Sequence, residues 1–396
     1  MSESLPLQLR IHGAIRDIPR ASWDALLDDD DGAPFLEWTW LEALEESGSV
    51  APAAGWHPRH FTLWSGSRLV AAAPAYLKDD SHGEFVFDWN WASSAERRGL
   101  AYYPKLIVAS PLSPATGRRL LVAPGENRAA RERELLQGIS GYARSERLSS
   151  VHVLFPTEAE TRALSEAGFA LRLGVQYQWR NEGYRDFEDF LGRFHAKRRH
   201  QIRHERREME RQGITLRTLR GEALGEVEPQ AVYDLYRSTV DRFVWGRRHL
   251  TPEFFRRVLQ GFRHRIEWVE ARKDGRRVAG AFNLATPRVL YGRYWGCFED
   301  IPFLHFNACQ YFPVEESIAL NRVRFEPGAG GEHKLVRGFE PALTWSAHLV
   351  FDRTLEREVR NFLEAERTAI QQGLPKWRAE TGFKSPSVGG ARKADG

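Results

Sequence analysis

A glycine-rich turn followed by three ionisable residues is the stretch of this sequence best suited to chemistry. Glu332, His333 and Lys334 come directly after residues 328–331, three of which are glycines. Glycine lets the backbone approach a ligand closely. An acid or an imidazole can remove a proton, and a lysine ammonium suits an oxyanion or a phosphate. The alternative is a solvated surface turn, for which glycine clusters are also typical.

The strand predicted before this turn supplies further candidates. Tyr291, Arg293 and Trp295 alternate with Gly292 and Tyr294. Because successive side chains of a strand point to opposite faces, one set faces the core while the other could line a cleft.

Residues 193–211 form the most basic tract, with eight Lys or Arg against three Glu. One interpretation is a solvated helix held by internal ion pairs. The other is a positive arm that includes Lys197 and Arg198 and binds phosphates of a donor, of a nucleotide-linked acceptor, or of RNA. The three histidines in the tract have no acidic residues at metal-ligand spacing, so we predict no metal site.

Hydrophobic patterns and turn signals indicate which elements position these residues. Residues 60–64 and 69–77 are predicted to pair as a hairpin, and residues 266–271 and 277–285 to pair around Asp274-Gly275. Each half of the chain then repeats the order helix, hairpin, strand, helix, strand. The repeat predicts two lobes of similar topology.

The boundary between the lobes is predicted near residue 181. Residues 1–181 form the N-terminal lobe, and residues 182–383 form the C-terminal lobe, which carries the basic arm. A C-terminal helix is predicted over residues 351–370. The Ser, Gly, Pro and Lys content of residues 384–396 predicts a disordered tail.

Composition limits the class of protein. The chain has 396 residues, 42% hydrophobic and 28% charged, which is typical of a globular protein with two domains. Cys297 and Cys309 cannot make a disulfide framework, which favours a reducing cytoplasm. No apolar run reaches the length of a membrane span, and the N-terminus lacks a signal pattern, so we predict no membrane insertion.

Several segments together resemble the FemAB-like family. They are Tyr-Gly-Arg-Tyr-Trp-Gly at 291–296 continuing to His305-Phe306, the block 330–339, Tyr-Tyr-Pro-Lys at 102–105, Lys-Arg-Arg-His-Gln-Ile-Arg at 197–203, and Thr-Pro-Glu-Phe-Phe at 251–255. That family is related to the GNAT acyltransferases and to the enzymes that add amino acids to peptidoglycan precursors. The resemblance implies an α/β fold (α+β, with mixed sheets) made of two tandem GNAT-like lobes.

Acyl transfer to an amine needs a base, donors for the developing oxyanion, and a grip on the activated donor. Glu332 and His333 rank first as the base, then Glu299, then His305, which could instead cap a helix or satisfy a core hydrogen bond. Lys334 resembles a basic residue that lies beside the aminoacyl ester in the peptidoglycan enzymes. The predicted catalytic residues are therefore Glu332, His333, Lys334 and Glu299. The predicted substrate-binding residues are Arg337, Arg293, Tyr291, Trp295, His305, Lys197, Arg198 and Lys105.

The donor is less well defined by the sequence. Single-lobe acetyltransferases grip coenzyme A with an Arg/Gln-x-x-Gly-x-Gly/Ala turn, and this chain has Pro302 and Phe303 in the corresponding segment. We therefore expect transfer of an aminoacyl or acyl group to a small-molecule or peptide amine, with aminoacyl-tRNA as donor. The alternatives are an acyl-CoA-dependent N-acetyltransferase and a non-catalytic module that binds a cell-wall precursor. No cofactor other than the donor is predicted.

Overall fold

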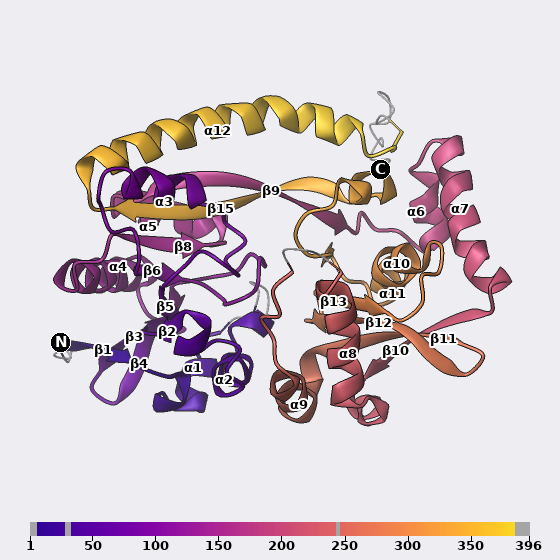
Figure 1. Cartoon of the computed structure of the whole chain (residues 1–396), viewed down its shortest axis with the longest axis horizontal. Helices are drawn as coiled ribbons and strands as arrows, with labels where there is room; N and C mark the ends of the chain where they lie inside the picture. The colour runs from indigo at the N-terminus through magenta and orange to yellow at the C-terminus, as the bar shows by residue number, and fades with distance from the viewer. Residues whose placement is uncertain (1–5, 28–32, 243–245, 385–396) are drawn as a thin grey trace, which may run out of the picture.

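The computed structural model describes residues 6–27, 33–242 and 246–384, and Figure 1 shows them as two lobes side by side. The first half supplies the strands β1 (Leu7–His12), β2 (Trp56–Pro58), β3 (His60–Ser65), β4 (Arg68–Ala73), β5 (Ala75–Lys78), β6 (Lys105–Val108), β7 (Leu121–Val122), β8 (Ser150–Leu154) and β9 (Ala170–Arg180). Its helices are α1 (Arg20–Asp24), α2 (Trp38–Glu46), α3 (Trp89–Glu96), α4 (Arg128–Ser145) and α5 (Thr161–Glu166).

The second half supplies the strands β10 (Ile214–Arg220), β11 (Ile266–Lys273), β12 (Arg276–Ala285), β13 (Val289–Cys297), β14 (Arg324–Glu326) and β15 (Glu340–Val350). Its helices are α6 (Phe187–Gly192), α7 (Ala196–Arg211), α8 (Pro229–Val240), α9 (Pro252–Gly261), α10 (Leu304–Phe306), α11 (Phe312–Ala319) and α12 (Arg353–Ala379). Two short segments near the site are the π-helical turn η7 (Asn307–Tyr311) and the 3-10 helix η8 (Glu332–Arg337).

One large sheet runs through both lobes. It has eleven strands in the order β10-β11-β12-β13-β14-β9-β15-β8-β6-β5-β2, and a smaller sheet has the order β1-β3-β4-β7. Two neighbouring pairs of the large sheet are parallel, β6 with β8 and β13 with β14. Each lobe therefore has one parallel pair within an otherwise antiparallel set of strands. The predicted α/β fold with mixed sheets, in tandem GNAT-like lobes, is confirmed.

The two halves of the chain exchange strands at the centre of this sheet. β9, from the first half, pairs with β14, and β15, from the second half, pairs with both β8 and β9. α12 lies across β9 and β15 (Figure 1), and it continues to Ala379, beyond the predicted residue 370. Residue 181 directly follows β9, so a cut there separates strands that pair with each other.

Most predicted elements are present, with one clear difference. The two hairpins form as β3–β4 and β11–β12. The strand predicted over 69–77 is instead two strands in different sheets, because Pro74 falls between β4 and β5 and cannot donate to a ladder. At the end of the described chain, Lys384 donates its backbone N–H to the carbonyl of Arg193 at 2.8 Å. Residues 385–396 of the predicted tail lie outside the described residues.

Aromatic residues from both lobes pack in a shared core. Trp40 of α2 meets Phe254 of α9 edge to face at 5.1 Å, and Phe35 meets Tyr291 of β13 at 5.2 Å. Burying each such ring contributes about 2 to 3 kcal/mol. This core holds the lobes against each other, so side chains on β13 keep a fixed position relative to the N-terminal lobe.

Two features of β13 shape the site. Phe282 pairs with Tyr294 and Asn283 with Gly292, so Arg293 is the extra residue of a β-bulge. Bulges bend a strand and redirect side chains, and they are common beside active sites. Gly296 is required by packing, because a Cβ there would lie 1.8 Å from the carbonyl oxygen of Leu235 on α8.

No helix in the described part of the chain is both long enough and apolar enough to cross a bilayer.

Candidate active site

A cavity of about 370 Å³ lies against the bulge of β13, where β14 ends and the glycine-rich turn begins. Crevices at the carboxyl ends of parallel strands are the usual place for ligands in α/β sheets. The cavity is lined by Thr239, Ala281, Asn283, Gly292, Arg293, Tyr294, Trp295, His305, Cys309, Gln310, Pro327, Ala329, Gly330, Gly331, His333 and Lys334.

The glycine-rich turn depends on left-handed backbone conformations. The φ angles of Gly328, Gly330 and Gly331 are +88°, +69° and +89°, which side-chain-bearing residues rarely adopt. Gly328 also passes close to β13, since a Cβ there would lie 3.3 Å from the carbonyl oxygen of Gly292. The turn leads into η8, which places Lys334 at the cavity.

Lys334 is buried, with 6% of its surface exposed. Its Nζ donates to the backbone carbonyls of Gly328 at 2.8 Å and Ala329 at 3.4 Å. Among the residues that the structure describes, no carboxylate forms an ion pair with it. Burial lowers the pKa of Lys334 to about 8. An ammonium has three donors, so this one keeps a donor for a ligand in the cavity.

Two imidazoles lie beside Lys334. The rings of His305 and His333 are 5.8 Å apart between centroids, and His305 also meets the ring of Trp295 at 5.4 Å. Burial and the neighbouring basic groups lower the pKa of His305 to about 4, and burial lowers the pKa of His333. Both rings are therefore neutral at pH 7 and able to accept a proton.

The predicted carboxylates do not line this cavity. Glu332 is exposed, because a 3-10 helix turns about 120° per residue and directs neighbouring side chains to different sides. Glu299 lies 3.7 Å from Arg276 in an ion pair outside the cavity. The structure brings His333, Lys334, His305, Arg293 and Trp295 together, and it leaves the two acids apart from them.

Arg293 and Tyr291 occupy different positions on the bulged strand. Arg293 lines the cavity, and its Nη2 donates to the carbonyl of Leu112 at 2.6 Å, across the boundary between the lobes. Tyr291 is 1% exposed and packs in the shared core. Arg293 can therefore meet a ligand directly, whereas Tyr291 supports the strand.

The other basic residues predicted in the second half of the chain lie outside the cavity, in two different places. Arg337 is buried outside the cavity, with Nη2 at 3.1 Å from both carboxylate oxygens of Glu205 on α7. Its guanidinium lies 3.4 Å from the ring centre of Phe306, so it joins η8 to α7 and α10. Lys197 and Arg198 lie on α7, away from the cavity lining.

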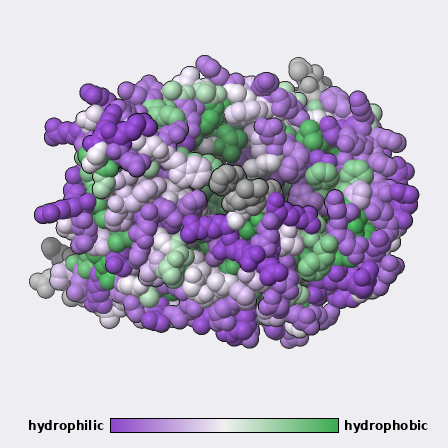
Figure 2. Space-filling model, viewed as in Figure 1, coloured by the Kyte–Doolittle hydropathy of each residue, from purple (hydrophilic) through white to green (hydrophobic). Residues whose placement is uncertain are grey.

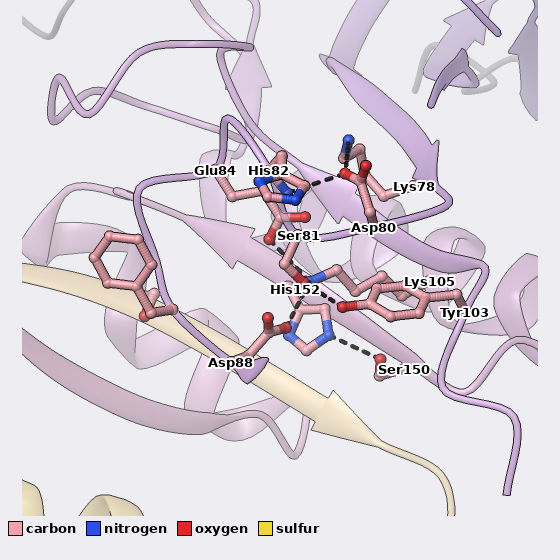
Figure 3. Close-up of polar contacts among 12 residues, drawn as sticks. Lys78, Asp80, Ser81, His82, Glu84, Asp88, Tyr103, Lys105, Ser150 and His152 are labelled. Atoms are coloured by element: carbon pink, nitrogen blue, oxygen red, sulfur yellow. Dashed lines mark hydrogen bonds and ion pairs between the residues drawn. The ribbon is translucent and has the colours of Figure 1, made fainter. Parts of the chain in front are cut away.

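Lys105 lies in the N-terminal lobe, in a different buried cluster (Figure 3). Its Nζ donates to Glu84 at 2.9 Å, Asp88 at 2.5 Å and Ser81 at 2.8 Å. Burial alone would lower the pKa of Lys105, but the two carboxylates raise it above its ordinary value. This lysine fixes both ends of the loop 84–88.

Sequence reasoning missed two polar residues of the cavity. Gln310, in η7, is 1% exposed and Asn283, in β12, is 3% exposed. Both amide atoms of Gln310 and Nδ2 of Asn283 are buried without a hydrogen-bond partner among the described residues. Buried polar groups are normally paired, so these amide atoms are available to a ligand or to water in the cavity. The sequence held one weak signal, the single amide in the apolar run 278–285, and the π-helical turn around Gln310, a feature frequent at functional sites, is visible only in the structure.

A second cavity, of about 390 Å³, lies on the other side of the turn and shares Ala329 and Gly330 with the first. It is largely apolar, with Phe85, Phe87 and Trp345 among its lining residues. Hydrophobic residues gather in the hollow near the upper centre of the face in Figure 2. The glycine-rich turn therefore has a cavity on each side.

In the described residues, no group of three or more His, Cys, Asp or Glu could hold a metal ion.

Comparisons with known proteins identify the family of this chain. The family described as peptidoglycan biosynthesis/recognition, FemAB-like, matches residues 14–385. The chain belongs to the FemAB-like family. No curated protein matches it. Membership of this family associates the chain with the biosynthesis or recognition of peptidoglycan.

Several solved structures are similar to this chain. The crystal structure of FemX covers 89% of this FemAB-like chain and 100% of its own, with a TM-score of 0.52 at 11% identity. A tandem GNAT protein from the clavulanic acid biosynthesis pathway covers 87% and 98%, with a TM-score of 0.45 at 13% identity. L-PGS from Bacillus licheniformis covers 85% and 97%, with a TM-score of 0.45 at 12% identity. At these identities the likeness to FemX is one of fold.

Proposed function

We propose that this FemAB-like protein transfers an aminoacyl or acyl group to an amine acceptor in the cavity around Lys334. The observation that carries the proposal is a buried lysine without a carboxylate partner among the described residues, facing a cavity beside two neutral imidazoles. An uncompensated ammonium in a low-dielectric site stabilises negative charge strongly.

The proposed reaction uses these groups in order. The amine nitrogen attacks the carbonyl carbon of the donor ester, and Lys334 Nζ stabilises the resulting oxyanion. His333 or His305 accepts the proton that the amine loses. When the C–O bond of the ester breaks, the same proton passes to the leaving alcohol oxygen, which leaves an amide and a free hydroxyl group. The amide of Gln310 can orient the donor carbonyl through its unpaired buried atoms.

We propose an aminoacyl-tRNA as the donor, because the segment that would grip coenzyme A is filled. Phe303 occupies the position before α10 with φ +65°, and its ring meets that of His204 on α7 at 5.9 Å. A bulky ring packed on α7 leaves no glycine turn there for a pyrophosphate.

The basic helix α7 supports the same donor. Arg203 and Arg206 are paired with Glu188 and Glu315, each at 2.5 Å. Lys197 and Arg207 have no carboxylate partner in the described part of the chain. These cations are available to the phosphates of a nucleic acid.

Incubation of the purified protein with a full set of charged tRNAs and a peptide amine tests the proposal. We expect one or more aminoacyl groups to be lost from tRNA and recovered on the amine, and Lys334→Ala to slow the transfer by about 10²-fold or more. Transfer from acyl-CoA alone would reject the tRNA donor and keep the site. Binding of a cell-wall precursor without any turnover would reject the enzyme and leave a recognition module.

A further inference from the structure

A cavity of about 690 Å³ lies between α4 and α5 in the N-terminal lobe, away from the transfer site. The two helices are in contact (Figure 1), and small side chains on them and next to the ends of α5 keep the groove open. Those small residues are Ala129, Ala159, Ala163 and Ala167. The volume is in the range of sites for small organic ligands.

Arginines are the main polar residues of this groove. Its lining includes Arg118, Arg128, Arg133 and Arg162, of which Arg162 pairs with Glu166 at 2.8 Å, and the second carboxylate is Glu132. α4 also begins at Arg128, so the positive end of the helix dipole lies at the same end of the groove. The groove therefore attracts a ligand that carries negative charge.

Arg128 lines the groove and carries one buried N–H donor that makes no hydrogen bond within the described chain. That donor is on Nη1. It forms a long ion pair with Glu132, one turn along α4, at 3.9 Å, and 41% of the Arg128 side chain is exposed. Arg131, three residues along the same helix but outside the groove lining, pairs with Glu126 at 2.9 Å and Glu134 at 2.5 Å. Arg128 is therefore less tightly paired than Arg131, and its guanidinium can turn to a ligand in the groove.

Glu132 forms the floor of the groove, with 6% of its surface exposed. Burial and the nearby Glu160 raise the pKa of Glu132 to about 7, while Arg128 and Arg118 oppose the shift. A protonated carboxyl group can donate a hydrogen bond to an anion, whereas an ionised one repels it. The floor of the groove can therefore accept an anion once Glu132 is protonated.

We propose that the α4–α5 groove binds a phosphorylated small molecule of nucleotide size, separately from the transfer site. Guanidinium groups match phosphate oxygens in bidentate geometry, and several arginines around one groove suit a group that carries more than one charge. The proposal rests on the groove alone and does not depend on the transfer reaction.

Calorimetric titration of the full chain with inorganic pyrophosphate and with ADP tests this site. We expect saturable binding at low ionic strength that weakens about tenfold in Arg128→Ala and in Arg133→Ala. Arg131→Ala is the matched control on the same helix, and it should bind as the wild type does. Tighter binding of ADP than of pyrophosphate would indicate a nucleotide, and equal binding would indicate the phosphates alone. Absence of saturable binding, or an equal loss in Arg131→Ala, would overturn the site.

Glu132→Gln gives an independent test with the opposite sign. Removing the carboxylate should strengthen pyrophosphate binding at pH 8 by about three- to tenfold and remove the dependence on Glu132 protonation. Weaker binding in this variant would contradict the proposal. Lys334→Ala should leave the titration unchanged, so failure of the transfer proposal and failure of this one are separate results.

Discussion

Lys105 and Lys334 are buried lysines in opposite lobes, and their surroundings shift their proton affinities in opposite directions. Lys105 contacts two carboxylates, and its pKa is raised. Within the described chain, Lys334 donates only to two backbone carbonyls, and burial lowers its pKa to about 8. The two sites differ in charge compensation far more than in depth.

The difference shows that burial of a lysine does not by itself indicate function. The two acids neutralise the charge of Lys105, so its ammonium is not available to bind a ligand. The charge of Lys334 is compensated only by dipoles, and that arrangement costs stability while keeping a positive charge for an oxyanion. We therefore propose a structural role for Lys105 and a catalytic one for Lys334.

Replacing Lys105 should have the largest effect on stability. Lys105→Met leaves Glu84 and Asp88 buried without a cation, and we expect the free energy of unfolding to fall by about 3 to 5 kcal/mol. Urea denaturation with both variants, Lys105→Met and Lys334→Met, measures the difference. A loss below about 1 kcal/mol in Lys105→Met would erase the contrast between the two lysines.

Replacing Lys334 should have the largest effect on catalysis. Loss of an oxyanion donor lowers kcat by about 10²- to 10³-fold, and we expect that loss in Lys334→Met with an unfolding free energy at least equal to that of the wild type. Steady-state kinetics of aminoacyl transfer gives kcat and KM separately. A change in KM alone would mean that Lys334 binds substrate and transition state equally.

The pH dependence of stability sharpens the same comparison. Because the folded pKa of Lys334, about 8, lies below the ordinary value of 10.5, the unfolded chain binds more protons between these pH values. The stability contributed by neutral Lys334 is complete above pH 10.5 and is lost as the pH falls to about 8. We expect the wild type to gain roughly 2 to 3 kcal/mol relative to Lys334→Met over this range. A constant difference between the two proteins would show that the pKa of Lys334 is not lowered.

Local signals in the sequence were sufficient for much of the fold. Asp274-Gly275 marks the β11–β12 hairpin, and Thr251 caps α9 by accepting from the N–H of Phe254 at 3.2 Å. The exchange of β9 and β15 between the lobes could not be predicted from such local signals, because it joins strands far apart in the chain. Nothing in the alternation of residues 340–350 specifies which distant strand they pair with.

The site was predictable at the level of the turn but not of every side chain. The glycines predicted a turn at which the backbone can approach a ligand closely, and the family motif drew attention to Lys334. Arg337 could not be separated from it by sequence, because its partner Glu205 is 132 residues away. Gln310 and Asn283 were missed because an amide has no characteristic spacing. Only the packing around them shows that their polar atoms are unpaired.

Glu332 offers the smallest expected effect and a test of the sequence prediction itself. It lies two residues from Lys334, but η8 has about three residues per turn, so the two side chains point to different sides. Glu332→Ala should therefore change kcat by no more than about twofold and stability by about 0.5 kcal/mol or less. His333→Ala, one residue further along, should lower kcat by about 10²-fold if its ring accepts the proton. If Glu332→Ala were instead the more damaging variant, the acid would reach the cavity in the working enzyme, and the base would be the carboxylate rather than an imidazole.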